Sequence, residues 1–435
     1  EEDETDVVPI GGAGVYVNGK GFHLEGFSVI DSVSEKGGGI FVESESKGLF
    51  RSMRIANNRA TQSQGGGGLY ISADSDIEIT DTLIEKNNGA EGGAMSIDSA
   101  KVDMMRVTFF NNTAQGNGGA IMIKGEHAIV SVLHSTFDSN TALSGDGGGL
   151  ALTDSKRPKD PPVCNVQSSV FRDNEALGGN GGNAMVDKSM TLNIMDSVIS
   201  CRTLWKNGDG EVMLGSLAPS AINGGGLYYG SGTNGTIMGV SIRGCKAEAG
   251  GGLYVVESEL VTIGTSPRST KKSTFQYNIA DFGGAVAVSL KASLTLQDML
   301  IMDNRANYDG AGVHVEDTYV EMNGVLILRN NADSRGGGVY VDKKGELIGR
   351  SVTLMENYAE GEGGGMYMGW GSHSVLQGCR FGSNIARASG GAIYTTSREG
   401  LFLVGTDIVI PQRIPPVLPI TDCVVVDGSS KNRLS

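Results

Sequence analysis

Short runs with an apolar residue at every second position return along the chain about every 26 residues, and each follows two or more small residues, mostly glycine. The run at 336–341 reads GGGVYV and the next, at 363–368, reads GGGMYM. Fourteen copies occupy 12–17, 37–42, 66–71, 92–97, 118–123, 147–152, 181–186, 224–229, 250–255, 283–288, 310–315, 336–341, 363–368 and 390–395. An apolar period of two predicts short strands with one buried face, whereas a helix needs a period of 3.6 and few glycines. A regular repeat of this length predicts a solenoid.

One repeat, residues 310–335, contains three such strands. Val313 and Val315 define the first, Val320 and Met322 the second, and the third follows around Ile327. Three short strands joined by three turns make one coil of a parallel β-helix. We therefore predict an all-β, right-handed parallel β-helix of about 14–15 coils with three strands per coil. Coils that stack at about 4.8 Å would form a rod roughly 65–70 Å long.

The same repeat sets the expected domain organisation. Residues 12–410 are predicted to form a single β-helix, with surface insertions at 153–163, 202–222 and 264–272. Residues 1–11 form an acidic lead-in without an initiator Met or signal peptide, which predicts a processed chain or a segment of a longer protein. Residues 411–435 contain prolines and are expected to form a tail or a cap. The insertions at 153–163 and 264–272 are basic loops, either solvated or able to hold an acidic partner, including another copy of the rod.

A second motif lies in the third strand, where a large apolar residue precedes an asparagine by three positions. An Ala usually follows two residues after the asparagine. The apolar residue is expected to fill the core, and the Asn side chain to bond the backbone of the turn and its stacked equivalents. A metal-binding role is the disfavoured alternative, because amides are poor sole ligands. The predicted structural ladder comprises Asn58, Asn112, Asn140, Asn174, Asn278, Asn304, Asn330, Asn357 and Asn384.

The two motifs together resemble those of a known group of surface proteins. Segments 118–121, 283–286 and 390–393 read GGA followed by Ile or Val, and five copies of the second motif read Phe-x-x-Asn. This combination resembles the repeats of the chlamydial polymorphic outer-membrane proteins and related large surface proteins of microbial eukaryotes. The resemblance covers roughly residues 12–395 and implies a surface-exposed β-helix that is commonly adhesive.

Two cysteines occupy the ladder position that asparagine holds elsewhere. Cys201 and Cys245 lie on successive coils, so their Cα atoms should be about 4.8 Å apart, within disulfide range. We predict that they are neighbours and form a disulfide in an oxidising compartment, with two buried free thiols as the alternative. The sequons at Asn111 and Asn234 are candidate N-glycosylation sites and agree with secretion.

Aromatic residues recur at the outward position of the glycine-led strand. The alternation places the middle residue of each run away from the core, so an exposed stripe of stacked rings is expected down one face. The stripe is a candidate interface for a protein neighbour or a glycan, and the structural alternative is that tyrosine favours strands and stacks on itself. Its candidate members are Tyr228, Tyr254, His314, Tyr340, Tyr367 and Tyr394.

Charge and motif content narrow the function classes. A formal charge of −14 and a pI near 4.9 argue against nucleic-acid binding, which needs a basic face. No run of 18 apolar residues predicts a membrane span, and no cofactor or catalytic motif is recognised. We expect an extracellular structural or adhesive protein, not an enzyme, that forms a cell-surface filament, appendage or coat with copies of itself or other surface proteins. The alternative is a carbohydrate-binding or polysaccharide-degrading (pectin-lyase-like) β-helix, and an ion- or ice-binding repeat is disfavoured.

Overall fold

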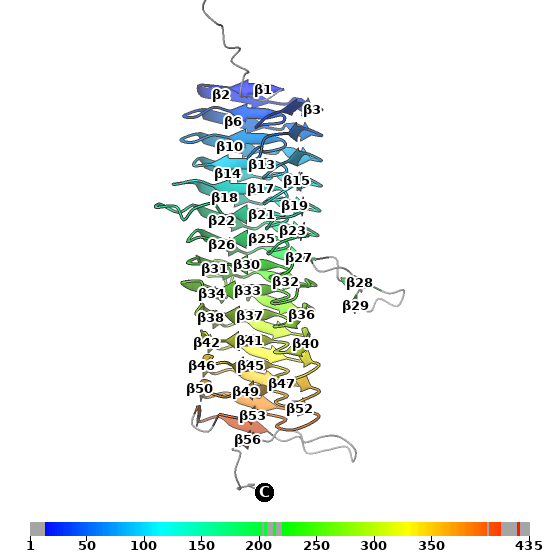
Figure 1. Cartoon of the computed structure of the whole chain (residues 1–435), viewed down its shortest axis with the longest axis vertical. Coiled ribbons are helices and arrows are strands. Elements are labelled where there is room, and N and C mark those ends of the chain that lie inside the picture. The colour runs from blue at the N-terminus through cyan, green and yellow to red at the C-terminus, as the bar shows by residue number, and fades with distance from the viewer. Residues whose placement is uncertain are drawn as a thin grey trace, which may run out of the picture.

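The computed structural model describes residues 14–201, 204–206, 212–214, 220–397, 400–409 and 424–426. These residues form a rod in which short strands stack from β1 at one end to β56 at the other (Figure 1). Three long parallel sheets, here called sheets A, B and C, run the length of the rod, and successive strands of each sheet are one coil apart. The predicted parallel β-helix with three strands per coil is confirmed.

Sheet A contains the glycine-led strands. Its strands are β1 (Val15–Val17), β5 (Ile40–Val42), β9 (Leu69–Ile71), β13 (Met95–Asp98), β17 (Ile121–Lys124), β21 (Leu150–Leu152), β25 (Ala184–Val186), β30 (Leu227–Tyr229), β33 (Leu253–Val256), β37 (Val286–Ser289), β41 (Val313–Glu316), β45 (Val339–Asp342), β49 (Met366–Met368), β53 (Ile393–Thr395) and β56 (Val424–Val426). β56 lies within the predicted C-terminal tail and pairs with β53. The remainder of that tail and the lead-in 1–11 lie outside the described residues.

Sheet B follows sheet A in each coil. Its strands are β2 (Lys20–Glu25), β6 (Lys47–Arg51), β10 (Asp76–Thr80), β14 (Lys101–Met105), β18 (Ile129–Leu133), β22 (Val163–Gln167), β26 (Thr191–Met195), β31 (Asn234–Met238), β34 (Leu260–Gly264), β38 (Ser293–Gln297), β42 (Tyr319–Asn323), β46 (Glu346–Arg350), β50 (His373–Gln377) and β54 (Leu401–Val404).

Sheet C completes the coil and carries the apolar residue of the asparagine motif. Its strands are β3 (Ser28–Ile30), β7 (Arg54–Ala56), β11 (Leu83–Glu85), β15 (Thr108–Phe110), β19 (Thr136–Asp138), β23 (Val170–Arg172), β27 (Val198–Ser200), β32 (Ser241–Arg243), β35 (Thr274–Gln276), β39 (Leu300–Met302), β43 (Leu326–Leu328), β47 (Thr353–Met355), β51 (Arg380–Gly382) and β55 (Asp407–Val409).

Two short ladders that the sequence did not predict lie between sheet C and the next glycine turn. One joins β4 (Val33–Ser34), β8 (Arg59–Ala60), β12 (Asn88–Gly89), β16 (Thr113–Ala114), β20 (Thr141–Ala142) and β24 (Glu175–Ala176). The other joins β36 (Ile279–Phe282), β40 (Arg305–Asp309), β44 (Asn331–Ala332), β48 (Tyr358–Ala359) and β52 (Ile385–Ala386). These ladders explain the Ala that usually follows two residues after the asparagine, because that side chain is buried at the corner.

The three insertions leave the coil at three different corners. Residues 153–162 connect β21 to β22, residues 265–273 connect β34 to β35, and residues 202–219 follow sheet C. Within the last insertion, β28 (Leu204–Lys206) pairs with β29 (Val212–Leu214) in an antiparallel hairpin. The rest of residues 202–219 lies outside the described part of the chain.

In-register stacking builds one hydrophobic core along the rod. Val313 and Val315 of β41 pair with Val339 and Val341 of β45, and equivalent apolar residues continue in both directions. The glycine doublet is required by close backbone contacts at the turn. Gly336 has φ +64°, and a Cβ on Gly337 would lie 2.2 Å from a backbone oxygen of the next coil.

The asparagine side chains form the predicted buried ladder. Asn330 Nδ2 donates to Ile301 O at 3.1 Å and to Asn357 Oδ1 at 3.0 Å. Asn330 Oδ1 accepts from the backbone N and Nδ2 of Asn304, at 3.1 and 2.9 Å. The same pattern joins Asn58, Asn87, Asn112, Asn140 and Asn174 in one series and Asn278, Asn304, Asn330, Asn357 and Asn384 in another. Asn87 was not among the predicted members.

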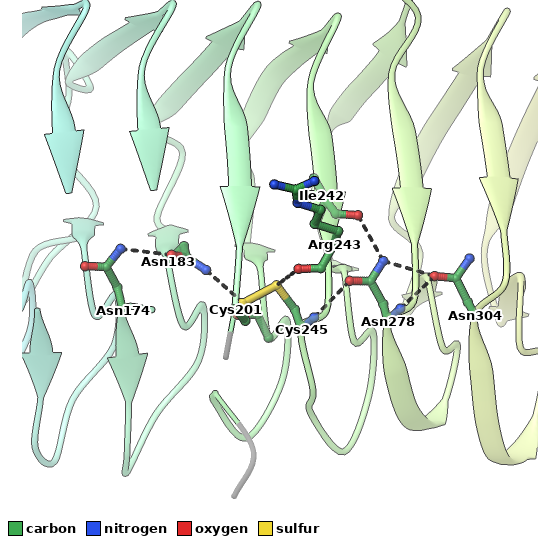
Figure 2. The surroundings of a disulfide bond; sticks show 9 residues. Asn174, Asn183, Cys201, Ile242, Arg243, Cys245, Asn278 and Asn304 are labelled. Atoms are coloured by element: carbon green, nitrogen blue, oxygen red, sulfur yellow. Dashed lines mark hydrogen bonds between the residues drawn. A yellow bond between two sulfur atoms is a disulfide. The ribbon is translucent and has the colours of Figure 1, made fainter. Parts of the chain in front are cut away.

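A disulfide and one additional asparagine fill the gap between the two series (Figure 2). Cys201 and Cys245 are joined, with their Cα atoms 4.8 Å apart. Asn183 replaces the third small residue of its glycine motif, accepts from Asn174 at 2.9 Å and donates to the Cys201 sulfur at 3.1 Å. On the other side, Cys245 N donates to Asn278 Oδ1 at 3.1 Å. The ladder of buried contacts is therefore continuous from Asn58 to Asn384.

Replacing one rung should destabilise the rod far more than replacing its neighbour. We expect Asn330→Ala to lower the free energy of unfolding by about 2–5 kcal/mol, because it leaves Asn304 N buried without its acceptor and removes the side-chain hydrogen bond to Ile301 O. The matched control is Asn331→Ala, whose exposed side chain should change stability by no more than about 0.5 kcal/mol. Chemical denaturation followed by circular dichroism measures both, and equal effects would contradict the role of the ladder.

Candidate functional site: the outer groove of sheet A

The aromatic residues of sheet A point away from the core, but most are not exposed as predicted. Tyr340 and His314 expose only 5% and 6% of their surface, and Tyr367 6%. Tyr228, Tyr254 and Tyr394 are half-buried. Of the nine aromatic rings at this position, His314 included, only Tyr16 near the N-terminal end is well exposed, at 52%. The expectation of an exposed stripe is therefore wrong for its central members.

The rings are covered because they stack on one another and because cations cross over them. His314 and Tyr340 have ring centroids 4.8 Å apart, and the Tyr340–Tyr367 and Tyr367–Tyr394 pairs follow at 5.1 and 5.6 Å. The Arg335 guanidinium lies 5.0 Å from the Tyr340 ring and 4.9 Å from the Tyr367 ring. Ring faces that contact each other are closed to a sugar, so the stripe is the floor of a groove and not a stacking platform.

The C-terminal section of this groove is wide and partly apolar. A cavity of about 710 Å³ and another of about 430 Å³ lie over β33 to β49. Trp370 and Leu290, on turns that leave sheet A, are 78% and 51% exposed at its edge. The aromatic stripe is interrupted at Ala287, which lies between Tyr254 and His314 on the adjacent strands. Ala287 lines the smaller cavity. The larger cavity is lined by Tyr254, Ser289, Leu290, Glu316, Asp317, Asp342, Lys343, Lys344 and Trp370.

Most charges in this section are paired within the chain. The Arg335 guanidinium donates two hydrogen bonds of 3.1 and 2.9 Å to Asp309. Burial acts to lower the pKa of the guanidinium, but the bonds to Asp309 raise it above its usual value. Lys343 forms an ion pair with Glu316, and the Tyr340 hydroxyl donates to an Asp342 oxygen at 2.8 Å. Half-buried Asp317 differs, because within the described residues its carboxylate has no hydrogen bond or ion pair.

Burial sets the protonation state of His314. It lowers the pKa of the imidazole to about 4, although the nearby carboxylates of Glu316 and Asp309 act in the opposite direction. The ring is therefore neutral above that pH and stacks as an uncharged ring on Tyr340.

The N-terminal section of the groove is polar, and the sequence did not predict it. A cavity of about 350 Å³ contains the buried side chain of Lys124, whose Nζ lies 3.6 Å from Glu91 Oε2 and makes no hydrogen bond among the described residues. Asp146 accepts from Asn180 N at 2.7 Å, and burial raises the pKa of its carboxyl. The other lining residues are Gln64, Asn117, Met122, Thr153, Asp154, Ser155, Asp187 and Lys188. These residues come from different repeat positions on several coils, so no periodic signal connects them.

The remaining candidate residues lie apart from the groove floor. Asn111 is exposed at a turn with φ +53°, whereas half-buried Asn234 donates to Glu259 at 3.1 Å. Free Cys164 and Cys379 are buried, and burial raises the pKa of the Cys164 thiol to about 12. Cys423 lies outside the described residues.

The two basic loops differ in how they lie on the rod. In the 264–272 insertion, Arg268 donates to Gln167 at 2.8 Å and Ser269 contacts Asp196, so this loop folds back on the coils before it. In the 153–163 insertion, Lys156, Arg157 and Lys159 are exposed and, within the described residues, their side-chain charges are unpaired.

Two kinds of site are absent from the described residues. No group of three or more His, Cys, Asp or Glu side chains there is placed to hold a metal ion. The same ranges contain no helix that is long and apolar enough to cross a membrane.

Comparison with known proteins identifies the repeat in general terms. A family model described as a right handed beta helix region matches residues 3–142. None of the curated proteins matches. Among solved structures, tailspike protein 3 of bacteriophage CBA120 aligns with 11% identity over 91% of this chain and 55% of that chain, with a TM-score of 0.35. The chain thus spans about half the length of that tailspike chain.

The buried histidine should make stability depend on pH. Between pH 6.5 and about 4 the unfolded chain takes up a proton that folded His314 does not, so the free energy of unfolding falls as pH falls. This one group should contribute about 3 kcal/mol across that interval. We expect His314→Phe, which keeps the ring stack, to lack this component. Denaturation on both sides of the interval measures it, and parallel pH profiles for the two proteins would contradict the assignment.

Proposed function

We propose that this chain is an extracellular structural or adhesive rod, a subunit of a cell-surface filament, appendage or coat that binds protein neighbours along the outer groove of sheet A. The observation that carries the proposal is the wide groove section edged by exposed Trp370 and Leu290. Exposed large apolar side chains beside a cavity are characteristic of protein-binding surfaces. The chlamydial resemblance supports the same class of function, and the proposed role is binding and not catalysis.

The groove runs parallel to the long axis of the rod, which suits it to bind a partner that lies alongside the rod. It follows a sheet that runs the length of the rod, so a partner can contact several coils at once. Stacked, buried rings and paired charges beneath it form a rigid floor, which reduces the entropy lost on binding.

Electron microscopy of negatively stained native surface material and of the purified chain tests this function. Rods joined into filaments or lattices are expected when the two are combined. Trp370→Ser with Leu290→Ser should reduce incorporation at least about tenfold, because both anchors of the interface are lost. The control is Phe110→Ser with Val170→Ser, two exposed apolar residues on sheet C. Isolated rods in every mixture would contradict the proposal.

A second candidate function, carbohydrate binding, is favoured by the polar section of the groove. Lys124 Nζ is buried without a hydrogen-bond acceptor in a cavity that also contains the carboxylates of Glu91, Asp146 and Asp187. Sugar hydroxyls both accept and donate, so they would satisfy the ammonium and the remaining lone pairs of the carboxylates. Carboxylates outnumber cations here, which favours a neutral glycan over an anionic one.

Calorimetric titration with cellohexaose and with hexagalacturonate measures this second function. Binding of the neutral oligosaccharide is expected to weaken at least about tenfold in Lys124→Met, which keeps the length of the side chain but removes the donors. Lys101→Met, at an exposed position on sheet B, is the control. Unchanged affinity in Lys124→Met, or no binding of either probe by the wild type, would exclude a glycan site in this cavity for these ligands.

A further inference from the structure

We propose that two copies of this chain pair side by side and antiparallel, with the loop formed by residues 156–162 of each copy docked in the C-terminal groove section of the other. The proposal rests on the proposed function in protein assembly and names the partner as a second copy. It joins the loop to the cavity that Trp370 and Leu290 edge.

The loop has the sequence of a docking segment. Residues 156–162 read Lys-Arg-Pro-Lys-Asp-Pro-Pro, in which Pro158 and Pro161 have PxxP spacing with basic residues before and between them. The chain bends at 159–160, so the loop presents its proline rings and basic side chains together, a combination that fits a groove with aromatic side chains and carboxylates. The connection between β21 and β22 that contains it extends from the side of the rod (Figure 1).

The loop is held in place before any partner binds. His127 N donates to Asp160 O at 2.9 Å, and Lys159 N donates to Glu126 Oε1 at 3.3 Å. At the start of the insertion, Asp154 Oδ2 accepts from Gly125 N at 2.9 Å. These bonds fix the backbone to the preceding coil while the cationic side chains remain exposed, so little entropy is lost on docking.

The C-terminal groove section has the complementary features. Exposed Trp370 and Leu290 provide apolar contacts for proline rings at the edge of the cavity of about 710 Å³. Asp317 provides a half-buried carboxylate whose charge is not paired within the described residues. A guanidinium is the strongest partner for such a carboxylate, and Arg335 on Asp309 shows the same pairing in the adjacent cavity. The exposed Lys344 at the rim is the one unpaired cation among the lining residues, so proline contacts and Asp317 carry most of the recognition.

The positions of loop and groove define the geometry of the pair. Both lie where the chain passes from sheet A to sheet B, the loop after β21 and the edge residues after β37 and β49. They are four to seven coils apart along the rod, about 20–35 Å. A loop anchored to its own coil cannot cross that distance. Two rods laid antiparallel along this corner place each loop opposite the groove of the other, and the resulting interface is two-fold and closed.

Sedimentation velocity of the full chain over a range of micromolar concentrations tests the pair. A monomer–dimer equilibrium is expected for the wild type. Reversing the loop charges with Lys156→Glu, Arg157→Glu and Lys159→Glu, or removing the anchor with Trp370→Ser, should weaken dimerisation about thirtyfold. The matched control is Arg268→Glu, Lys271→Glu and Lys272→Glu, which makes the same charge change in the other basic loop. Thermal unfolding confirms that each variant is folded.

Carbodiimide cross-linking adds a geometric readout. A bond between Lys156 or Lys159 and Asp317 must join two chains, and mixing isotopically labelled with unlabelled protein identifies such links by mass spectrometry. A covalent dimer with these links supports the proposal. Longer covalent ladders would overturn the closed antiparallel pair, as would a wild type that remains monomeric or a dimer that the loop variant does not weaken.

The two proposals fail in different ways. If the loop variant still enters native filaments or lattices as the wild type does, the loop–groove contact is wrong and the assembly function stands. If the purified chain dimerises through the loop but never joins native surface material, the contact stands and the assembly function is wrong.

Discussion

The stacking of each coil directly on the one before it is the constraint on which the rest of this structure depends. Strands in sheets A, B and C bond only to the same strands of adjacent coils, at a spacing set by the backbone hydrogen bond. Every position therefore meets its own equivalent above and below. Glycine is required where the turns approach closely, and asparagine is suited to the corner because one amide both donates to and accepts from its neighbours.

The Cys201–Cys245 disulfide shows how strict this constraint is. Two coils lack the asparagine, and the gap is closed by a covalent bond together with Asn183, which enters the ladder from the glycine turn. The longest insertion begins directly after Cys201, so the bond secures the coil at the point where its regular path is broken. The ladder of buried side-chain contacts therefore stays continuous here, although asparagine is replaced by cysteine.

The outer face of sheet A shows the opposite behaviour, because its residues vary from coil to coil. Near the C-terminal end the floor is a stack of aromatic rings crossed by Arg335, and nearer the N-terminus it is a polar cavity around Lys124. The turns from sheet A to sheet B supply Trp370, Leu290 and the 153–162 loop along one corner. A uniform core thus supports an outer surface whose chemistry changes along the length of the rod.

The sequence by itself determined the features that depend on one position meeting its equivalent in the next coil. The fold, the strand positions and the asparagine ladder follow from the repeat period, and so does the proximity of Cys201 and Cys245. The repeat period does not predict contacts between residues at different repeat positions. Burial of Tyr340 beneath Arg335, the entry of Asn183 into the ladder and the ion pair of Lys124 with Glu91 depend on side-chain conformations and turn shapes. Only the tertiary structure decided these, because they join residues that share neither a repeat position nor a fixed distance along the chain.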